Sequence, residues 1–280
     1  MGANIKAIRA RIKSVDSTKH ITKAMNLVAS SKIRRASARM EQSRFFRQVL
    51  LDAFADLAAE KSSYSEQRSR SLPTLYIIIA GDRGLAGGYN NNIFRSAMTM
   101  LNGNDLILPI GKRAVEYYKA HGNVISEEYI SAENFTAEQS AQAAYRIRDL
   151  YDRGEIGAVS LIATKFVSML SQEPSLTRLL PLEMQKPENA EEDFAPAALV
   201  EYEPSAEEVL AAAIPEYISG VLYTSVMEAF ASELAARRSA MDTATKNADA
   251  MLDDLSLKYN RARQGAITQE ITEIVAGANA

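Results

Sequence analysis

The chain has 280 residues, a net charge of −3 and 47% hydrophobic residues, which is typical of a soluble globular protein of one or two domains. It contains no cysteine, which excludes disulfides and thiolate chemistry, and its two histidines stand at unrelated positions, which argues against a zinc or iron site. The longest aliphatic run, residues 75–80, is too short to span a membrane, and the N-terminus lacks the apolar core of a secretory signal.

A long helix is predicted for the N-terminal segment, residues 1–60. Residues 4–60 contain no proline and are rich in good helix formers. Apolar residues recur at steps of three and four, the spacing of a left-handed coiled-coil seam, beginning with Ile5, Ile8, Ile12 and Val15. After a shift the pattern resumes at Met25 and Val28. Twelve basic residues and two acidic ones lie between residues 6 and 47. This positive helix suits either nucleic acid or an acidic protein surface.

The middle segment, residues 72–200, predicts a Rossmann-like domain with a central parallel sheet. Strand-like apolar runs alternate with helical stretches, which is typical of βαβ units. The expected strands are residues 75–80, 106–110, 158–163 and 176–182. The expected helices are residues 92–101, 112–121 and 136–153, the last one opened by a capping pair of Thr136 and Gln139. Flanking prolines place the fourth strand near an edge.

A glycine-rich loop, residues 81–90, follows the first expected strand. Its position before a helix suits phosphate binding, but its glycines do not follow the G-x-G-x-x-G order and no lysine is placed as in a P-loop. We therefore expect a tight structural turn, with Asp82 and Arg83 paired to each other or facing a partner. No cofactor is predicted, and we identify neither a catalytic nor a metal-binding constellation.

The C-terminal segment, residues 205–280, predicts a second long helix. A capping box of Ser205 and Glu208 opens it, and Pro215 predicts a kink or a late start. The same alternating step of three and four continues along its far end through Leu252, Leu255, Tyr259, Ala262, Ala266, either Glu270 or Ile271, and Ile274. The alternative is two ordinary helices of a bundle, although the middle segment is too poor in helix to complete one.

An antiparallel pair of helices has partners whose residue numbers add to a constant. If the helices leave the middle domain at about Leu57 and Ser205, that constant is about 262, which places Met25 opposite Arg237. Residues after about 261 then form a single-helix overhang with an apolar stripe, and such a helix is unstable in water unless something encloses it. The sequence therefore predicts a sleeve of other proteins around the C-terminal end.

Three separated motifs resemble one known family. They are residues 267–278 (ITQEITEIVAGA), residues 21–32 (ITKAMNLVASSK) and residues 82–90 (DRGLAGGYN), where the family often has cysteine at the position of Ala86. In this order they resemble the γ subunit of F-type ATP synthase, the central rotor stalk, and the resemblance covers essentially the full chain. It implies a non-catalytic rotary shaft that couples proton flow through the c-ring to conformational change at the catalytic sites of the β subunits.

The resemblance also implies which residues meet partners. Met25 and nearby basic residues would face an acidic lever loop of the β subunits, and Arg237 would support Met25 from the other helix. Arg263 and Gln264 would meet β loops that grip the shaft. The full set of expected contact residues is Lys23, Met25, Lys32, Arg34, Arg35, Asp82, Arg83, Arg237, Arg263, Gln264, Thr268, Glu270 and Glu273; the last three carry over only as motif members.

The family's partners would be the α and β subunits of the head, the ε subunit and the c-ring, with no nucleic acid and with membrane contact only through the c-ring. Because no transit peptide precedes the first motif and no cysteine pair is inserted, we expect a bacterial protein, peripheral on the cytoplasmic face of the inner membrane. Two alternatives remain. One is a nucleic-acid-binding protein with a basic coiled-coil arm and a nucleotide-binding domain, and the other is a static coiled-coil scaffold.

Overall fold

A computed structural model describes residues 2–59, 63–65, 68, 71–120, 123–125, 130–182 and 202–278. The chain divides into two compact units. The helical unit consists of Met1–Ser31 with Arg237–Ala280, and the sheet unit consists of Lys32–Ala236. Two long helices, α1 (Gly2–Ala59) and α5 (Ala206–Ala278), contribute residues to both units. The predicted segment ends at residues 1, 60, 200 and 280 lie outside the described residues.

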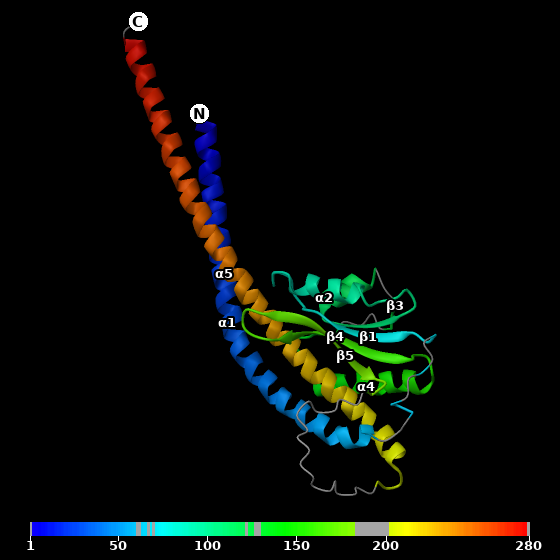
Figure 1. Ribbon diagram of the computed structural model, residues 1–280. Helices are drawn as coiled ribbons and strands as arrows, with labels where there is room; N and C mark the ends of the chain where they lie inside the picture. The colour runs from blue at the N-terminus through cyan, green and yellow to red at the C-terminus, as the bar shows by residue number, and fades with distance from the viewer. Residues whose placement is uncertain are drawn as a thin grey trace. The chain divides into compact units, whose positions relative to one another are not determined.

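The sheet unit contains one five-stranded sheet (Figure 1). Its strand order is β3-β2-β1-β4-β5, and all pairs are parallel except the antiparallel pair of β4 and β5. The strands are β1 (Thr74–Ile79), β2 (Leu106–Ile110), β3 (Asn123–Val124), β4 (Ala158–Phe166) and β5 (Gln172–Leu180). The Rossmann-like parallel sheet predicted from the sequence is therefore confirmed.

Helices cover both faces of this sheet, which explains why its central strands are continuous apolar runs. The shorter helices are α2 (Tyr89–Met98), α3 (Lys112–Tyr118) and α4 (Ala137–Asp152). Side chains alternate across β1, so that Ile77 and Ile79 join the apolar cluster formed with α4 and α5, whereas Ile78 joins the cluster formed with α2 and α3. All three isoleucine side chains are fully buried.

The structure differs from the sequence prediction at the two edges of the sheet. The short β3 was not predicted, and β5 begins at Gln172, earlier than the expected residue 176, and includes Pro174. Proline is tolerated there because β5 is an edge strand, as predicted, and an edge strand needs only half of its backbone donors. The predicted capping box at Thr136 and Gln139 is present, with hydrogen bonds of 3.2 and 3.1 Å.

Helix α5 begins at Ala206, one residue after the predicted cap, and the Glu208 N–H donates to the Ser205 hydroxyl over 3.2 Å. Pro215 lies inside the helix, so the predicted late start is wrong. An apolar stretch of α5 is long enough to cross a membrane by length and composition alone. That stretch is 61% buried, and its buried residues between Leu210 and Ala235 pack in the clusters of the sheet unit, as expected for a core helix.

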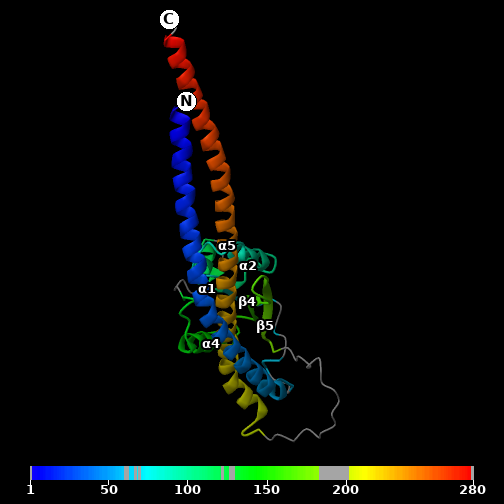
Figure 2. The same ribbon diagram turned by 90° about the vertical axis from the view of Figure 1, so that its left-hand side faces the viewer.

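The helical unit is an antiparallel pair of α1 and α5 (Figure 2). The predicted seam is confirmed at Ile5, Ile8, Ile12 and Val15 in α1, which are less exposed than the residues between them, and at the five predicted positions of α5 from Leu252 to Ala266. Val28 and Ile274, which the same step of three and four places on the seam, are 57% and 70% exposed, so the prediction is wrong there.

Polar side chains also join the two helices of this unit. Examples are Arg9 with the Tyr259 hydroxyl at 3.0 Å, Lys19 with Asp249 at 2.5 Å and Thr22 with Thr245 at 2.8 Å.

The residue numbers of these three pairs add to 267 or 268, so the predicted constant of about 262 is wrong. Met25 therefore lies level with residues 242–243, about 8 Å along the axis from the predicted Arg237. The predicted constant is too low because it assumed that the helices leave the middle domain at Leu57 and Ser205. In the sheet unit, α1 meets α5 through the rings of Phe54 and Tyr217, whose centroids are 5.3 Å apart, and α5 has already run for several residues before that contact.

A disulfide tests this register in a chain that has no cysteine of its own. The double variant Thr22→Cys/Thr245→Cys should oxidise readily, because the two hydroxyl oxygens are 2.8 Å apart and a disulfide needs Cα atoms within about 7 Å. The shifted pair Thr22→Cys/Thr243→Cys should oxidise poorly, and so should Met25→Cys/Arg237→Cys. Non-reducing electrophoresis measures the yield. A high yield for the Met25 pair and a low yield for the Thr22 pair would restore the constant of about 262.

Candidate interaction sites

The C-terminal tip of α5 is the first candidate surface. With the observed pairing, Gly2 lies level with about residue 265, so α1 has no residue to pair with the last turns of α5 (Figure 1). The tip nevertheless carries exposed apolar side chains, namely Ile267 (44%), Ile271 (56%), Ile274 (70%) and Val275 (54%). A single helix with such a stripe is stabilised only by a partner that covers it.

The predicted contact residues of the tip are all exposed. They are Arg263, Gln264, Thr268, Glu270 and Glu273. Local hydrogen bonds occupy some of their polar groups, since the Thr268 hydroxyl donates to the Gln264 carbonyl over 3.0 Å and the Gln269 amide donates to Glu273 over 2.8 Å. These bonds belong to the helix itself, so the side chains form a polar surface around the apolar stripe and not a closed site.

A second surface lies on α1 around Met25, within the helical unit. Met25 is half-buried and Lys23 is exposed. Sequence reasoning missed the exposed apolar side chains beside them: Ile21 and Leu27 are 60% and 65% exposed, and Val28, which the pattern placed on the seam, is 57% exposed. The motif contained these residues, but the seam pattern alone did not reveal that they point outward. Arg237 is buried, with 9% exposure, so it presents little of its side chain to solvent.

In the sheet unit, the basic residues of α1 fall into two groups. Arg34 and Arg35 are exposed, whereas Lys32 forms an ion pair with Glu133 of the same chain.

Arg44 donates to the Glu228 carboxylate over 2.6 Å and also to the Phe166 carbonyl over 2.9 Å. The Glu228 side chain is only 11% exposed, and it also accepts the Phe166 N–H over 3.0 Å. Lys32 and Arg44 therefore bind the second half of α1 to other elements of the sheet unit. Their neighbours in the sequence do not indicate this role.

The glycine-rich loop is organised by Asp82, which is half-buried. Its carboxylate accepts four hydrogen bonds, from the backbone N–H groups of Lys112, Ala132 and Glu133 at 3.1, 3.2 and 3.0 Å and from the Ser131 hydroxyl at 2.8 Å. Burial alone would raise the pKa of Asp82, but these donors together hold the pKa below its ordinary value of 3.8. Asp82 is thus a structural centre of the loop, whereas Arg83 is exposed.

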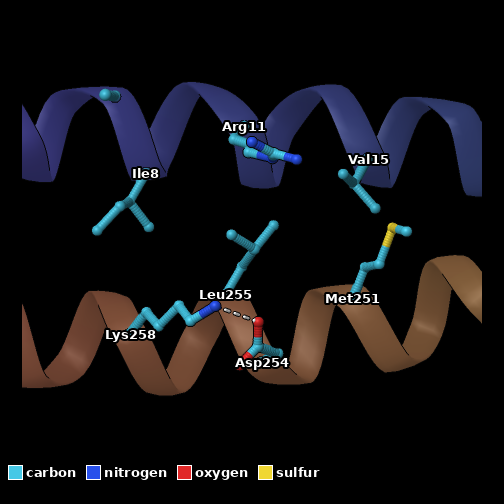
Figure 3. A pocket seen from close by; sticks show the side chains of 8 residues that line it. Ile8, Arg11, Val15, Met251, Asp254, Leu255 and Lys258 are labelled. Atoms are coloured by element: carbon cyan, nitrogen blue, oxygen red, sulfur yellow. Dashed lines mark hydrogen bonds and ion pairs between the residues drawn. The ribbon is translucent and has the colours of Figure 1, made fainter.

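A cavity of about 520 Å³ lies between the two helices of the helical unit (Figure 3). Ile8 and Val15 of α1 and Met251 and Leu255 of α5 point into it, and the ion pair of Lys258 with Asp254 borders it. This space is a groove open to solvent, since Arg11, Met251 and Lys258 of its lining are exposed. Among the described residues no group of histidine, aspartate and glutamate side chains is arranged to hold a metal ion.

The role of Asp82 predicts a pH-dependent loss of stability. Asp82→Asn should lower the free energy of unfolding by about 1–2 kcal/mol at pH 7, because it removes charge-assisted acceptors from a half-buried cluster. The pKa of Asp82 is lower in the folded chain than in the unfolded chain, so its stabilisation is present above the unfolded pKa and is lost as pH falls through the folded pKa. Urea unfolding should therefore show the variant approaching the parent progressively as pH falls below 3.8, the ordinary pKa of this carboxyl group.

The control is Asp149→Asn, which breaks an exposed ion pair with Arg153 and should change the free energy of unfolding by less than about 1 kcal/mol. An Asp82→Asn variant as stable as the parent at pH 7 would contradict the structural role of this carboxylate.

Comparison with known proteins agrees with this architecture. A family model described as ATP synthase matches residues 4–280. The ATP synthase gamma chain of Ruminococcus albus is 42% identical over 97% of this chain and 96% of its own length, and that of Ruminiclostridium cellulolyticum is 37% identical over 100% and 99%. A solved Euglena gracilis mitochondrial ATP synthase contains a chain with the same fold, with a TM-score of 0.74 and 19% identity over 100% of this chain and 95% of that chain.

The full-length match and the identity of about two residues in five go well beyond a shared fold. The chain belongs to the ATP synthase gamma chain family.

Proposed function

We propose that the chain is the central rotary shaft of an F-type ATP synthase, which couples proton flow through the c-ring to conformational change at the catalytic sites of the β subunits. The observation that carries this proposal is the uncovered apolar tip of α5. Ile271 and Ile274 are 56% and 70% exposed at the end of a helix that has no partner in the described chain at that level. A surrounding protein sleeve gives these side chains the apolar environment that water does not provide.

The mechanical part of the proposal rests on asymmetry. A pair of unequal helices presents a different side to each surrounding subunit, so turning it biases each catalytic site in turn between conformations of different nucleotide affinity. Exposed basic side chains of α1, including Lys23, Arg34 and Arg35, would meet an acidic lever loop of the β subunits. Arg263 and Gln264 would meet the β loops around the tip, where both are exposed.

We revise the set of proposed contact residues. Lys32 and Asp82 hold this chain together through Glu133 and the loop backbone, so we assign them to positioning the surfaces and not to direct contact. Arg83 and the tip residues Thr268, Glu270 and Glu273 remain proposed contacts. We propose residues 1–60 and 205–280 as the shaft, with the overhang beginning near residue 266, and residues 72–200 as the domain that meets the ε subunit and the c-ring.

In this proposal the chain is a non-catalytic subunit, because the nucleotide chemistry belongs to the β subunits. Its partners are the α and β subunits of the head, the ε subunit and the c-ring, and it contacts the membrane only through the c-ring. Relatives from bacteria such as Ruminococcus albus support a bacterial complex, in which the chain is peripheral on the cytoplasmic face of the inner membrane.

The nucleic-acid-binding alternative receives no support from the family match or from the charges. Three basic residues of α1 are already paired with carboxylates of the same chain, in the pairs Lys19–Asp249, Lys32–Glu133 and Arg44–Glu228. These ion pairs within the chain leave fewer cationic side chains available to bind the phosphates of a nucleic acid. A static scaffold is distinguished by function, since it would not link the tip to any ATPase activity.

Removing the tip tests the proposal. Deleting residues 267–280 should weaken assembly with the head subunits or lower ATP-driven proton pumping in inverted membrane vesicles, while the purified chain keeps its melting temperature within about 2 °C. The full-length variant Ile271→Gln/Ile274→Gln should act in the same direction, because each isoleucine loses about 1–2 kcal/mol of burial in the sleeve.

The matched control changes neighbouring polar positions of the same helix, Gln269→Ala/Thr272→Ala, and should assemble and pump like the parent. Unchanged assembly and pumping in both the deletion and the double glutamine variant would contradict the shaft proposal.

A further inference from the structure

The connections of β1 and β4 run on opposite faces of the sheet. The chain leaves β1 through α2, which packs in one apolar cluster, and enters β4 through α4, which packs in the other. The two strands are parallel neighbours. In open α/β sheets, the crevice at the carboxyl ends of two such strands is the usual place for a ligand. The glycine-rich loop, residues 81–90, follows β1 and therefore borders this crevice.

Helix α5 lies across the crevice. The Glu228 carboxylate accepts the Phe166 N–H, at the carboxyl end of β4, over 3.0 Å. The Tyr89 hydroxyl, from the first residue of α2, donates to the Ala229 carbonyl over 2.8 Å. One turn farther along α5, the Glu233 side chain reaches the residues that follow β1. A segment of the chain itself therefore stands where proteins with this kind of sheet bind a ligand.

The Glu233 carboxylate lies against the backbone of Gly81. A Cβ on Gly81 would be 2.7 Å from the carboxylate carbon and 2.8 and 3.1 Å from the two carboxylate oxygens. Any other residue at position 81 would therefore displace the carboxylate. Glu233 is only 2% exposed, so bulk water does not solvate it. A carboxylate in such a place is stable only when polar groups of the chain surround it, and Glu233 does interact with other groups of this chain.

We propose that the crevice is a carboxylate-binding site whose ligand is the side chain of Glu233. The site explains why the glycine-rich loop has the position of an anion-binding loop but lacks the phosphate-binding motifs. The first turn of α2 contains no acidic residue, and its N-cap residue Gly88 makes no side-chain cap, so an anion from another element can complement the positive end of this helix. Docked α5 and a free anionic ligand exclude each other. This site is a property of the folded chain and does not require rotation.

Small anions test the site directly. Glu233→Ala removes a group of the size of one acetate ion and should lower the melting temperature of the purified chain by about 4 °C or more. Sodium acetate should then raise the melting temperature of this variant by about 3 °C more than sodium chloride of equal ionic strength, because acetate refills the site. The parent should respond equally to both salts within about 1 °C, because Glu233 already occupies the site.

The matched control is Leu234→Ala. Leu234 is the next residue of the same helix and is equally buried, with 2% exposure, but its truncation leaves an apolar space. This variant should also lose stability, and acetate should stabilise it no more than chloride does. An acetate effect that is no larger in Glu233→Ala than in Leu234→Ala would overturn the inference.

A second variant gives an answer even if Glu233→Ala does not fold. Glu233→Gln keeps the shape of the side chain and removes only the charge. If the site binds a carboxylate, this variant should melt about 3 °C or more below the parent, because charge-assisted hydrogen bonds are replaced by weaker ones. A Glu233→Gln variant as stable as the parent would overturn the inference.

The position of the carboxylate is tested by a second substitution. Gly81→Ala should be strongly destabilising in the parent, where the new Cβ would lie 2.7 Å from the carboxylate carbon, and nearly neutral in Glu233→Ala, where that space is vacated. The added methyl group should also abolish the stabilisation of the double variant by acetate. An equal fall in melting temperature from Gly81→Ala in both backgrounds would show that the carboxylate does not occupy this space.

Discussion

The structure depends on the burial of the first half of α5. Between Leu210 and Ala235 most residues of this helix are buried, against the sheet on one side and against α1 on another. Bulky side chains such as Ile218 and Leu222 fill the core, and Gly220 allows close approach, because a Cβ there would lie 2.3 Å from the Leu50 side chain. One helix therefore holds the sheet unit together before it enters the helical unit.

Sequence periodicity was sufficient to predict the helices and strands that bury one regular face. The strands at 75–80 and 106–110 and the seams of both long helices were predicted closely because apolar spacing is local information. The antiparallel direction of β5 and the pairing of Thr22 with Thr245 were not predicted, since both depend on contacts between distant residues. The late helix start predicted at Pro215 is wrong for the same reason. Burial of α5 in the core stabilises the helix by more than the loss of the one backbone hydrogen bond that proline cannot make.

For the candidate sites, the sequence identified the surfaces better than the individual roles. The motif match identified Arg263 and Gln264, and both are exposed. The unequal lengths of the two helices predicted the apolar tip, whose side chains are also exposed. In contrast, the partners of Lys32 and Arg44 lie 101 and 184 residues away, so no local pattern could show that these cations are internally paired. The contact of Glu233 with Gly81 likewise joins distant residues and is revealed only by the folded chain.

Direct observation of rotation is the most decisive measurement. Leu170, which is 88% exposed in the sheet unit, is a suitable position for a single cysteine in this cysteine-free chain, to which a bead is attached while the head subunits are fixed to a surface. If the chain is a rotary shaft, ATP hydrolysis turns the bead continuously in one direction, and withholding ATP stops it. A bead that only fluctuates about a fixed angle, in a complex that hydrolyses ATP at the normal rate, would show that the chain does not rotate.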